Sequence, residues 1–579
     1  MRYSPLTLPH TSPVATARAL LPAMAPRPLG GASRPDRVLP RADARVQAAR
    51  WALGLGALGL AGLLVWAMAS ALAPMEPLDW VALGLFALSV GWTSLAATIS
   101  LLGLLPAARR TGPAPRWRPR GRTAILVMTC GEPPAPVAAM VRDLARGLDR
   151  VGLAPGRLTG LFILSDTRGP AAAIEAQAFG RLAGIEGVWW RQRPRNIGRK
   201  PGNLAHWLRG WSGNWDHMIV LDADSRMSPE RVRNLIHRLE TQPGTGLVQA
   251  GLSLVPARSR FGALQRLSSR LAGPGFGRGL AAWTGTEGNY WGHNAAMRVE
   301  AFADHAARLP VLPGRAPMGG TVLSHDFVEA AFLRRAGWGV EIDPDGRGSF
   351  EDGPQRLEEF HRRDRRWCQG NLQHLRLLAA PGLHPISRLH LICGVMGYVA
   401  APLWLGLVLT LALGGVTIGT VWPLIGGLSL LAVPKLAGSA GWLRRARSPA
   451  RRRVVLRAAR VELGLSTLLA PILMLRQSLA VCDVALGRDV GWQPAGGAAP
   501  QRAAVAGRLE LGAGLALAAA AVAMVGPVGV AVLSPVLGPL LFAPWLVRWF
   551  DAPLPGRLRA QPAPPPLPSA DLPAPQGAA

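Results

Sequence analysis

Long apolar runs divide the chain into membrane-like and soluble-like parts. A helix needs about 20 consecutive, mainly apolar residues to cross ~30 Å of hydrocarbon. Runs that approach or exceed this length lie at residues 51–73, 80–106, 391–415, 416–437, 509–530 and 532–547. They predict two transmembrane helices within residues 51–106 and four more within residues 385–550.

The segment 461–487 is also apolar, but it carries Arg476 and Asp483. Its charges leave open whether it is a span or an interfacial or re-entrant helix. The chain would then have six spans plus this segment, or eight spans if the segment is itself a hairpin. Arginine-rich stretches at residues 34–50, 109–122 and 444–460 flank the hairpins. By the positive-inside rule, these stretches and the central region are expected to be cytoplasmic.

The central region, residues 107–384, contains no run of spanning length. Short β-type runs alternate there with segments of helical spacing. The runs are residues 123–129, 161–166, 187–193 and 217–224, and the helical segments are 135–148, 170–182, 203–211 and 229–240. This alternation predicts an α/β domain with a mainly parallel sheet wrapped by helices. Ligands of such sheets bind at the carboxyl ends of the strands.

The two ends, residues 1–50 and 551–579, are rich in Pro, Ala and Arg and lack periodicity over most of their length, so flexible tails are expected. No signal peptide is expected, because the first long apolar run begins only at Trp51.

Composition excludes several classes of protein. The 579 residues are 49% hydrophobic and 17% charged, which is too apolar for a disordered chain or an ordinary soluble protein. The four cysteines form no CxxC pair, so neither a zinc ribbon nor a disulfide framework is indicated. The net charge of +30 would suit nucleic acid, but much of the excess arginine lies beside the apolar runs. We therefore expect inner-membrane lipid, and no nucleic acid, as the partner of this charge.

Acidic residues close two of the predicted strands. Asp166 follows one, and Asp222 and Asp224 follow another. Residues i and i+2 of an extended segment point to the same side, so Asp222 and Asp224 present two carboxylates to one volume. Such a pair suits Mg²⁺ or Mn²⁺ with phosphate oxygens completing the shell. A solvated turn, or a helix cap before Pro229, is the alternative.

Lysine is rare in this chain, which contains only Lys200 and Lys435. Lys200 lies at a predicted loop-to-helix junction, in the sequence Arg199-Lys200-Pro201-Gly202-Asn203. A compact ammonium there suits a phosphate or nucleotide oxygen. A chance surface position is the alternative. Lys435 is expected to extend its ammonium to the end of a span.

Two later segments also carry candidate chemistry. Asp326 in Ser324-His325-Asp326 is either an N-cap or a reactive carboxylate, and the basic run ending at Arg366 and Trp367 is either a lipid contact or part of a site. His293 and Asn294 lie among aromatic residues and are interpreted as structural or acceptor-site residues.

The order of these residues resembles processive, membrane-integrated glycosyltransferases of family 2, the cellulose, chitin and hyaluronan synthase group. Longer strings resemble the glucans biosynthesis glucosyltransferase H subgroup, which makes osmoregulated periplasmic glucans. These strings are Tyr290-Trp291-Gly292-His293-Asn294-Ala295, the stretch from Leu323 to Ala331, Arg334-Arg335-Ala336-Gly337-Trp338-Gly339-Val340, and the stretch from Arg363 to Cys368 followed by Gly370-Asn371-Leu372. The resemblance is strong over residues 120–410.

The resemblance implies a cytosolic GT-A domain that transfers glucose from UDP-glucose to a growing β-glucan. Asp166 would contact uridine, Asp222 and Asp224 would hold Mg²⁺ or Mn²⁺, and Lys200 and Arg366 would face the departing diphosphate. Asp326 would be the general base, and Trp367 would carry the terminal sugar of the acceptor. The remaining substrate-binding residues would be Glu132, Asn203, His293, Asn294 and Arg363.

The sequence departs from the subgroup at Gly131-Glu132, where its members have Asn-Glu, and in an N-terminal region of only about 50 residues. The resemblance also implies glucan export across the inner membrane and a periplasmic glucan-modifying partner. Three alternatives remain open: another family 2 polysaccharide synthase, an inactive membrane scaffold, and a transporter with a regulatory soluble domain. The intact acidic set argues against the scaffold, and the nearly uncharged spans argue against the transporter.

Overall fold

A computed structural model describes residues 27, 42–105, 112–114, 116–414, 418–489 and 507–555. Most of the expected flexible tails lies outside these residues.

The α/β domain is built on a seven-stranded sheet with the order β11-β6-β8-β4-β1-β2-β3. Every pairing is parallel except those of β8, which runs antiparallel to β4 and β6. The strands are β1 (Thr123–Thr129), β2 (Thr159–Ser165), β3 (Val188–Gln192), β4 (His217–Asp222), β6 (Thr245–Ala250), β8 (Ala295–Arg298) and β11 (Gly339–Asp343). The first four lie at the predicted runs, and the predicted mainly parallel sheet is confirmed.

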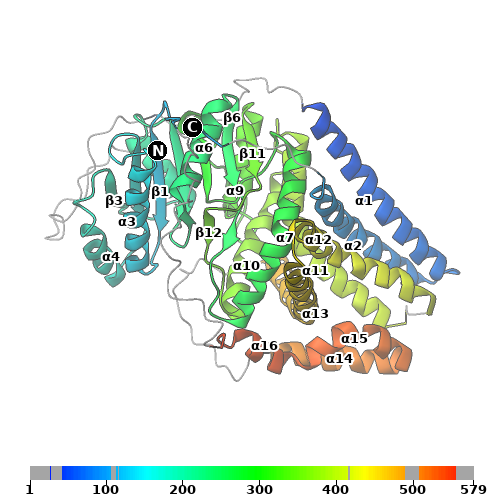
Figure 1. The fold of residues 1–579 in the computed structure, drawn as a ribbon. Coiled ribbons are helices and arrows are strands. Elements are labelled where there is room, and N and C mark those ends of the chain that lie inside the picture. Colours follow the sequence, from blue (N-terminus) through cyan, green and yellow to red (C-terminus); the bar gives the residue numbers. More distant parts are fainter. Residues whose placement is uncertain are drawn as a thin grey trace.

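Helices cover both faces of this sheet (Figure 1). Side chains of β1 alternate between two hydrophobic cores, with Leu126 in one and Val127 in the other. The first core is closed by α5 (Arg199–Trp211), α8 (Val299–His305) and α9 (His325–Arg335). The second is closed by α3 (Pro134–Arg150), α4 (Pro170–Gly180) and α6 (Pro229–Thr241). Burial on both faces explains why these strands read as continuous apolar runs.

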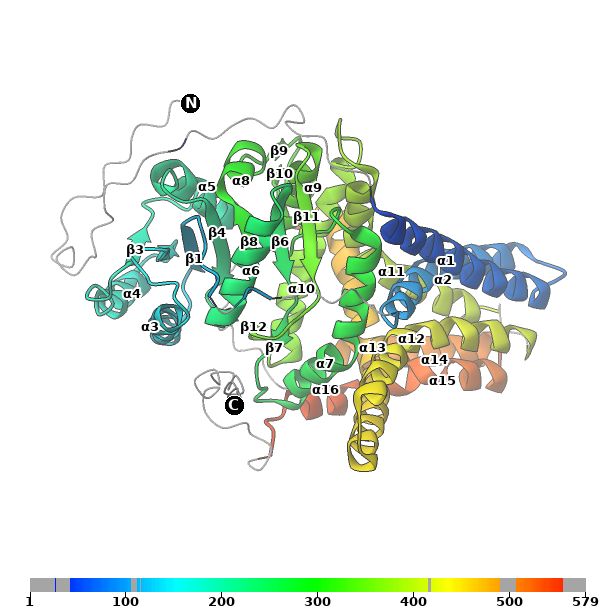
Figure 2. The same ribbon diagram turned by 45° about the horizontal axis from the view of Figure 1, so that its top comes forward.

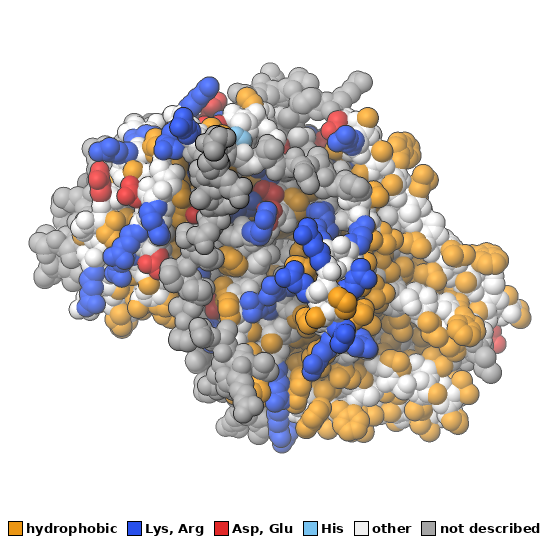
Figure 3. All heavy atoms as spheres, viewed as in Figure 1, with side chains coloured by type: hydrophobic (Ala, Val, Ile, Leu, Met, Phe, Trp, Pro, Cys, Tyr) orange, Lys and Arg blue, Asp and Glu red, His pale blue; other side chains and the backbone are white. Residues whose placement is uncertain are grey.

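Five helices are long and apolar enough to cross a membrane among the described residues. They are α1 (Ala44–Ala71), α2 (Pro77–Leu102), α11 (Pro385–Ala412), α12 (Val421–Arg445) and α13 (Pro449–Ala485). Figure 2 shows α1, α2 and α12 extending away from the sheet. Hydrophobic side chains dominate the surface of this helical part in Figure 3.

The C-terminal apolar segments differ from the expected pattern. Residues 461–487 fall largely within α13, a continuous helix of 37 residues. The segment after it forms α14 (Arg508–Met524), which has 17 residues and at ~1.5 Å per residue falls short of ~30 Å. The next forms α15 (Pro527–Leu541) and α16 (Ala543–Asp551), which are bent by 54° and count as a sixth span only if taken together. Pro535 and Pro539 interrupt the backbone hydrogen bonding of α15.

Lys435 differs from its expected position at the end of a span. Its Nζ lies 2.9 Å from Oε1 of Glu462, a buried residue of α13. The same oxygen accepts a hydrogen bond from Ser268 of α7 (Arg260–Thr284) at 2.6 Å. Pairing within the helical part therefore replaces the expected contact with the membrane surface.

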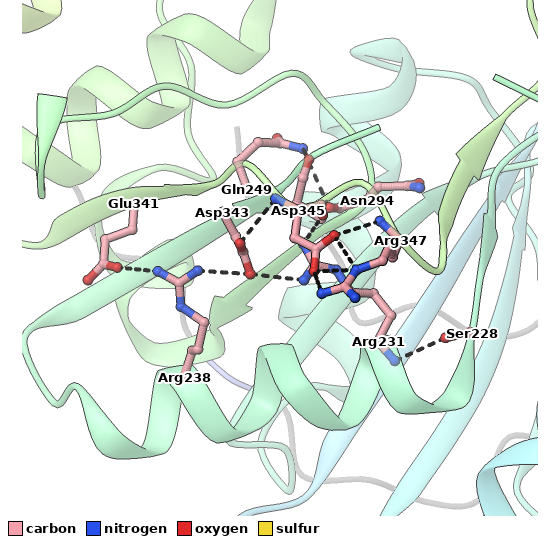
Figure 4. Close-up of polar contacts among 10 residues, drawn as sticks. Ser228, Arg231, Arg238, Gln249, Asn294, Glu341, Asp343, Asp345 and Arg347 are labelled. Carbon is pink, nitrogen blue, oxygen red and sulfur yellow. Dashed lines mark hydrogen bonds and ion pairs between the residues drawn. The ribbon is translucent and has the colours of Figure 1, made fainter. Parts of the chain in front are cut away.

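A buried ion-pair network fixes α6 to the edge strand of the sheet (Figure 4). Arg231 and Arg238 of α6 lie 2.9 and 3.0 Å from Oδ2 of Asp343 in β11, and Arg238 also contacts Glu341 at 2.5 Å. A small three-stranded sheet lies beside this network, in the order β5 (Arg226–Met227), β12 (Ser349–Glu351) and β7 (Ser253–Leu254). Its strand β5 follows β4 directly along the chain. A two-stranded sheet pairs β9 (Val311–Leu312) with β10 (Gly320–Thr321). These ion pairs hold α6 against β11 and thereby fix the chain that follows β4 at the carboxyl edge of the sheet.

The α7 helix joins the α/β domain to the apolar helices through glycines. A Cβ atom on Gly279 would lie 1.8 Å from the carbonyl oxygen of Ile99 in α2. A Cβ on Gly438 of α12 would lie 2.1 Å from the carbonyl oxygen of Leu271. Backbones therefore touch at these crossings, as small residues permit between membrane helices.

We predict that Gly279→Ala destabilises the protein, because the new methyl group forces α7 away from α2. Overpacking of this kind costs about 1–3 kcal/mol. Thermal unfolding of the detergent-solubilised protein, followed by tryptophan fluorescence, should show a lowered midpoint. The matched control is Gly273→Ala in the same helix, where the nearest atom would be 3.8 Å away. Equal midpoints for the two variants would contradict the close contact.

Candidate active site

The candidate site lies where β1, β2 and β4 end at one edge of the sheet. Asp222 is the last residue of β4 and stands opposite Met128 of β1. Lys200, in the first turn of α5, forms an ion pair with Oδ1 of Asp222. On the other carboxylate, Oδ2 of Asp224 lies 3.5 Å from Nη2 of Arg363. The two predicted metal ligands are thus flanked by two of the predicted cationic residues.

The two carboxylates influence each other's ionisation. Burial and the charge of Asp222 raise the pKa of Asp224 to about 6. Burial also acts to raise the pKa of Asp222, but the charges of Lys200 and His293 lower it overall. A divalent cation would relieve this repulsion. Among the described residues no group of three or more His, Cys, Asp or Glu could hold a metal. The two carboxylates of Asp222 and Asp224 are donors that suit a cation such as Mg²⁺, which takes its other ligands from water and phosphate.

Asp326 faces the same volume from the first turn of α9. A Cβ atom on Gly292 would lie 3.7 Å from Oδ2 of Asp326 and 3.8 Å from Nζ of Lys200. Gly292 has a φ of +87°, a conformation that favours glycine. The carboxylate of Asp326 and the ammonium of Lys200 are therefore close neighbours across this glycine.

The start of α9 is fixed by α10 (Leu357–Leu372) and by the short 3₁₀ helix η2 (Gln373–Arg376). His374 Nε2 lies 3.0 Å from the carbonyl oxygen of Ser324, and Oε1 of Gln373 accepts from the backbone N–H of Leu323 at 2.9 Å. A Cβ on Gly370 would approach the Ser324 nitrogen to 2.7 Å. These contacts set the position of Asp326 relative to α10.

One face of α10 is directed to the site. Arg363, Arg366 and Trp367 are spaced i, i+3 and i+4, so they share a helix face. Burial, together with the charges of Arg363 and Arg199, lowers the pKa of Arg366, and Asp222 is close enough to oppose this shift. Trp367 is 42% exposed. The arrangement leaves an aromatic side chain open to a ligand beside the cationic residues.

The other face of α10 is anchored to α13. Oδ2 of the buried Asp364 accepts a hydrogen bond from Nε2 of Gln477 at 3.0 Å. Burial raises the pKa of Asp364 to about 6, although hydrogen bonds from Gln477 and Tyr398 act in the opposite direction. This carboxylate therefore ties the helix that carries the basic motif to the apolar helices α11 and α13.

Asp166 does not point freely into the site. Both of its oxygens accept hydrogen bonds from Arg193, at 2.7 and 2.6 Å, and both side chains are buried. Arg193 also donates to the carbonyl oxygens of Ile197 and Arg199. The pair therefore shapes the loop that delivers Lys200. Arg193 is not among the residues predicted from the sequence, where its one signal is its place just after β3.

Two predicted substrate-binding amides are also engaged within the protein. Asn203 is buried, donates to the carbonyl oxygen of Leu164 at 3.0 Å and accepts from Arg191 at 2.8 Å. Asn294 is buried and donates to Oγ of Ser349 at 2.9 Å. The resemblance implies a substrate contact for both residues, and in the structure these hydrogen bonds connect their amide groups to the surrounding strands and helices.

Glu132 and His293 lie close to the carboxylate pair. Glu132 accepts from the Cys130 N–H at 2.5 Å, and burial raises its pKa, with Asp222 near enough to add to the shift. His293 Nδ1 is 3.2 Å from Oγ of Ser225, which in turn accepts from the Asp222 N–H. Its Nε2 lies 3.3 Å from Glu351, a residue that the sequence analysis missed. Burial acts to lower the pKa of His293, but Asp222 and Glu351 raise it to about 9.

Comparison with known proteins adds an independent observation. Residues 217–418 match the family model described as glycosyl transferase family group 2. The match includes Asp222, Asp224, Asp326 and the basic motif of α10, and it leaves Lys200 outside.

Curated relatives confirm the resemblance drawn from the motifs. The chain is 41% identical over 456 residues to glucans biosynthesis glucosyltransferase H of Vibrio cholerae serotype O1, covering 72% of this chain and 62% of the relative. It is 38% identical over 475 residues to the protein of the same name from Shewanella sp. (strain ANA-3), covering 76% of this chain and 65% of the relative. The chain thus spans just under two thirds of the length of these relatives.

Among solved structures, the mannosyltransferase PcManGT from Pyrobaculum calidifontis, in complex with GDP-Man and Mn²⁺, aligns with a TM-score of 0.41 and 16% identity. The alignment covers 71% of this chain and 100% of that protein.

We predict that Asp364→Asn stabilises the protein at pH 7.5. The folded-state pKa of about 6 lies above the ordinary value of 3.8, so the folded state loses stability as pH rises through this window. Removing the ionisable group should recover on the order of 2 kcal/mol at pH 7.5 and little at pH 4. Thermal unfolding at both pH values measures the difference. A gain that is the same at pH 4 and pH 7.5 would contradict the raised pKa.

Proposed function

We propose that this chain, whose residues 217–418 match the model of glycosyl transferase family group 2, is an inverting membrane glucosyltransferase. Its donor is UDP-glucose, its acceptor is a growing β-glucan, and its product is the backbone of osmoregulated periplasmic glucans. The observation that carries the proposal is the convergence of Asp222, Lys200 and Asp326 at the carboxyl edge of a mainly parallel sheet.

The donor diphosphate is held on the side of Asp222 and Asp224. These carboxylates are the residues that would hold Mg²⁺ or Mn²⁺, which neutralises the negative charge that develops on the leaving diphosphate. Lys200, Arg363 and Arg366 supply fixed positive charge to the same group. Because these side chains are partly buried, water screens their attraction to the diphosphate less than it would at the protein surface.

Asp326 receives the proton in the transfer step. An acceptor hydroxyl attacks C1 of glucose from the face opposite UDP, its O–H proton passes to the Asp326 carboxylate, and the bond between C1 and the diphosphate oxygen breaks. UDP leaves with the bonding electron pair, and the new linkage has the inverted, β configuration. The exposed ring of Trp367 stacks against the terminal sugar of the acceptor and orients the hydroxyl.

The apolar helices place this chemistry at a membrane. We assign the arginine-rich turn between α12 and α13 and the α/β domain to the cytoplasmic side of the inner membrane, by the positive-inside rule. The α10 helix leads through η2 into α11, so the acceptor side of the site adjoins a membrane helix. Export of the glucan between these helices, and its later modification by a periplasmic protein, complete the proposal.

Asp326→Asn should abolish transfer, because the amide does not accept the proton, while UDP binding stays near the wild-type value. A positioned base contributes ~10²-fold or more, so the variant should keep less than about a tenth of wild-type turnover. Transfer from labelled UDP-glucose and UDP binding by calorimetry measure the two effects. Glu300→Gln, at an exposed acidic residue in the first turn of α8, is the matched control. Turnover above a tenth of wild type in Asp326→Asn would place the base elsewhere.

Membranes carrying the protein should convert labelled UDP-glucose and Mg²⁺ into a β-linked glucan, and linkage analysis of the product tests the assigned polymer. EDTA should stop the reaction, and added Mg²⁺ or Mn²⁺ should restore it. Asp224→Asn should need a much higher metal concentration for the same rate, because one of two protein ligands is lost. Activity that persists in EDTA would refute the metal role, and a cellulose-like linkage would refute the assigned product.

A further inference from the structure

Two arginines from different helices meet at the carboxyl end of α2. Nε of Arg278, in α7, donates to the carbonyl oxygen of Gly103 at 3.0 Å. Nη2 of Arg444, at the end of α12, donates to the carbonyl oxygen of Leu104 at 3.0 Å. The two carbonyls belong to consecutive residues, and the charge of Arg444 acts on Arg278, so the two guanidinium groups are near each other. A guanidinium has five N–H donors, so each keeps others for a ligand.

This arginine cluster, which also includes Arg445, has no carboxylate partner in the part of the chain that the structure describes. Burial, followed by the charges of Arg445 and Arg444, lowers the pKa of Arg278. By contrast, Arg193 and Arg231, two buried arginines of the α/β domain, are each paired with an aspartate. Among the described residues, no carboxylate therefore neutralises the positive charge of this cluster, although Arg278 is partly buried.

The cluster lies at the boundary of the apolar helices. Trp442 precedes Arg445 by three residues on α12, is 36% exposed, and donates its indole N–H to the carbonyl oxygen of Arg270 at 2.9 Å. The exposed apolar residues Leu101, Leu105 and Leu436 belong to the same two chain segments. Figure 3 shows Lys and Arg side chains gathered between the α/β domain and the hydrophobic surface of the helices. Tryptophan and arginine at such a boundary are typical of the headgroup level of a membrane.

We propose that this cluster binds the phosphate of an anionic phospholipid headgroup. The planar donors of Arg278 and Arg444 match phosphate oxygens, and the acyl chains lie against the exposed leucines of α2 and α12. A free phosphate would use the charges but not the apolar surface, so the combination favours a lipid.

The bound headgroup would link α2, α7 and α12, whose backbones come into close contact at Gly279 and Gly438. Arg278 lies less than two turns before the end of α7 at Thr284. The chain then runs through residues 285–291 to Gly292, which separates Lys200 from Asp326. The lipid site is thus connected through one helix to the candidate active site, although binding itself does not depend on the proposed transfer reaction.

The test uses the full-length protein in a neutral detergent and two readouts that need no catalysis. Native mass spectrometry counts bound phosphatidylglycerol or phosphatidylcholine, and thermal unfolding measures stabilisation by each lipid. The wild type should retain phosphatidylglycerol and be stabilised by it more than by phosphatidylcholine. The double variant Arg278→Gln, Arg444→Gln should bind phosphatidylglycerol about tenfold or more weakly, since each arginine near a headgroup contributes appreciably.

The matched control is Arg451→Gln, Arg453→Gln, which removes two exposed arginines from the first turns of α13. It should bind as the wild type does. Arg445→Gln, at an exposed side chain, tests the site if the double variant fails to fold, and it should also weaken binding. Equal losses in the control, or unchanged binding in Arg445→Gln, would overturn the proposal. Displacement of the lipid by millimolar inorganic phosphate, with equal stabilisation by phosphate alone, would overturn the assignment to a lipid.

Discussion

Two carboxylates held together at the end of a buried strand are the constraint around which the site is arranged. Asp222 and Asp224 repel each other, and the pKa of Asp224 is raised to about 6 as a result of burial and this repulsion. Each carboxylate has a cationic neighbour, Lys200 on one side and Arg363 on the other. Lys200 lies in the first turn of α5 and Arg363 near the middle of α10, so the carboxylate pair links both helices to the end of β4. Lys200 and Arg363 would therefore partly neutralise the two carboxylates before a nucleotide-sugar and its metal bind.

The α10 helix connects this site to the membrane part of the protein. Its Arg363 and Arg366 face the carboxylates, while Asp364 bonds to Gln477 of α13. Close packing of Gly370 against Ser324 then positions the start of α9, and with it Asp326. A displacement of α13 would therefore reach the candidate base and the candidate phosphate ligands through one rigid helix. This connection gives a physical route by which movements of the apolar helices would reach the candidate site.

The sequence was sufficient for features that depend on local pattern. Strands β1, β2 and β4 are mainly apolar runs, and the acids at the ends of β2 and β4 mark the carboxyl edge. It was not sufficient for hydrogen bonds between distant residues. Asp166 and Arg193 are 27 positions apart, and nothing in their spacing predicts that their side chains form an ion pair. The α7 helix was also not predicted, because its glycines have low helix propensity. They are favoured there by close backbone contacts with α2 and α12, which are distant in sequence. Lys435 was likewise assigned to the membrane surface because Glu462 is distant in sequence.

The two lysines have a chemical consequence. Lys200 pairs with Asp222 and Lys435 with Glu462, so each side-chain amine lies beside a carboxylate. Reagents that acylate amines attack the neutral form, and the remaining basic side chains of the chain are arginines or histidines. Among side chains, acylation of lysine amines is therefore confined to the candidate site and to one interhelical contact. Selective labelling of Lys200, and its protection by a bound nucleotide, would report on occupancy of the site without following any product.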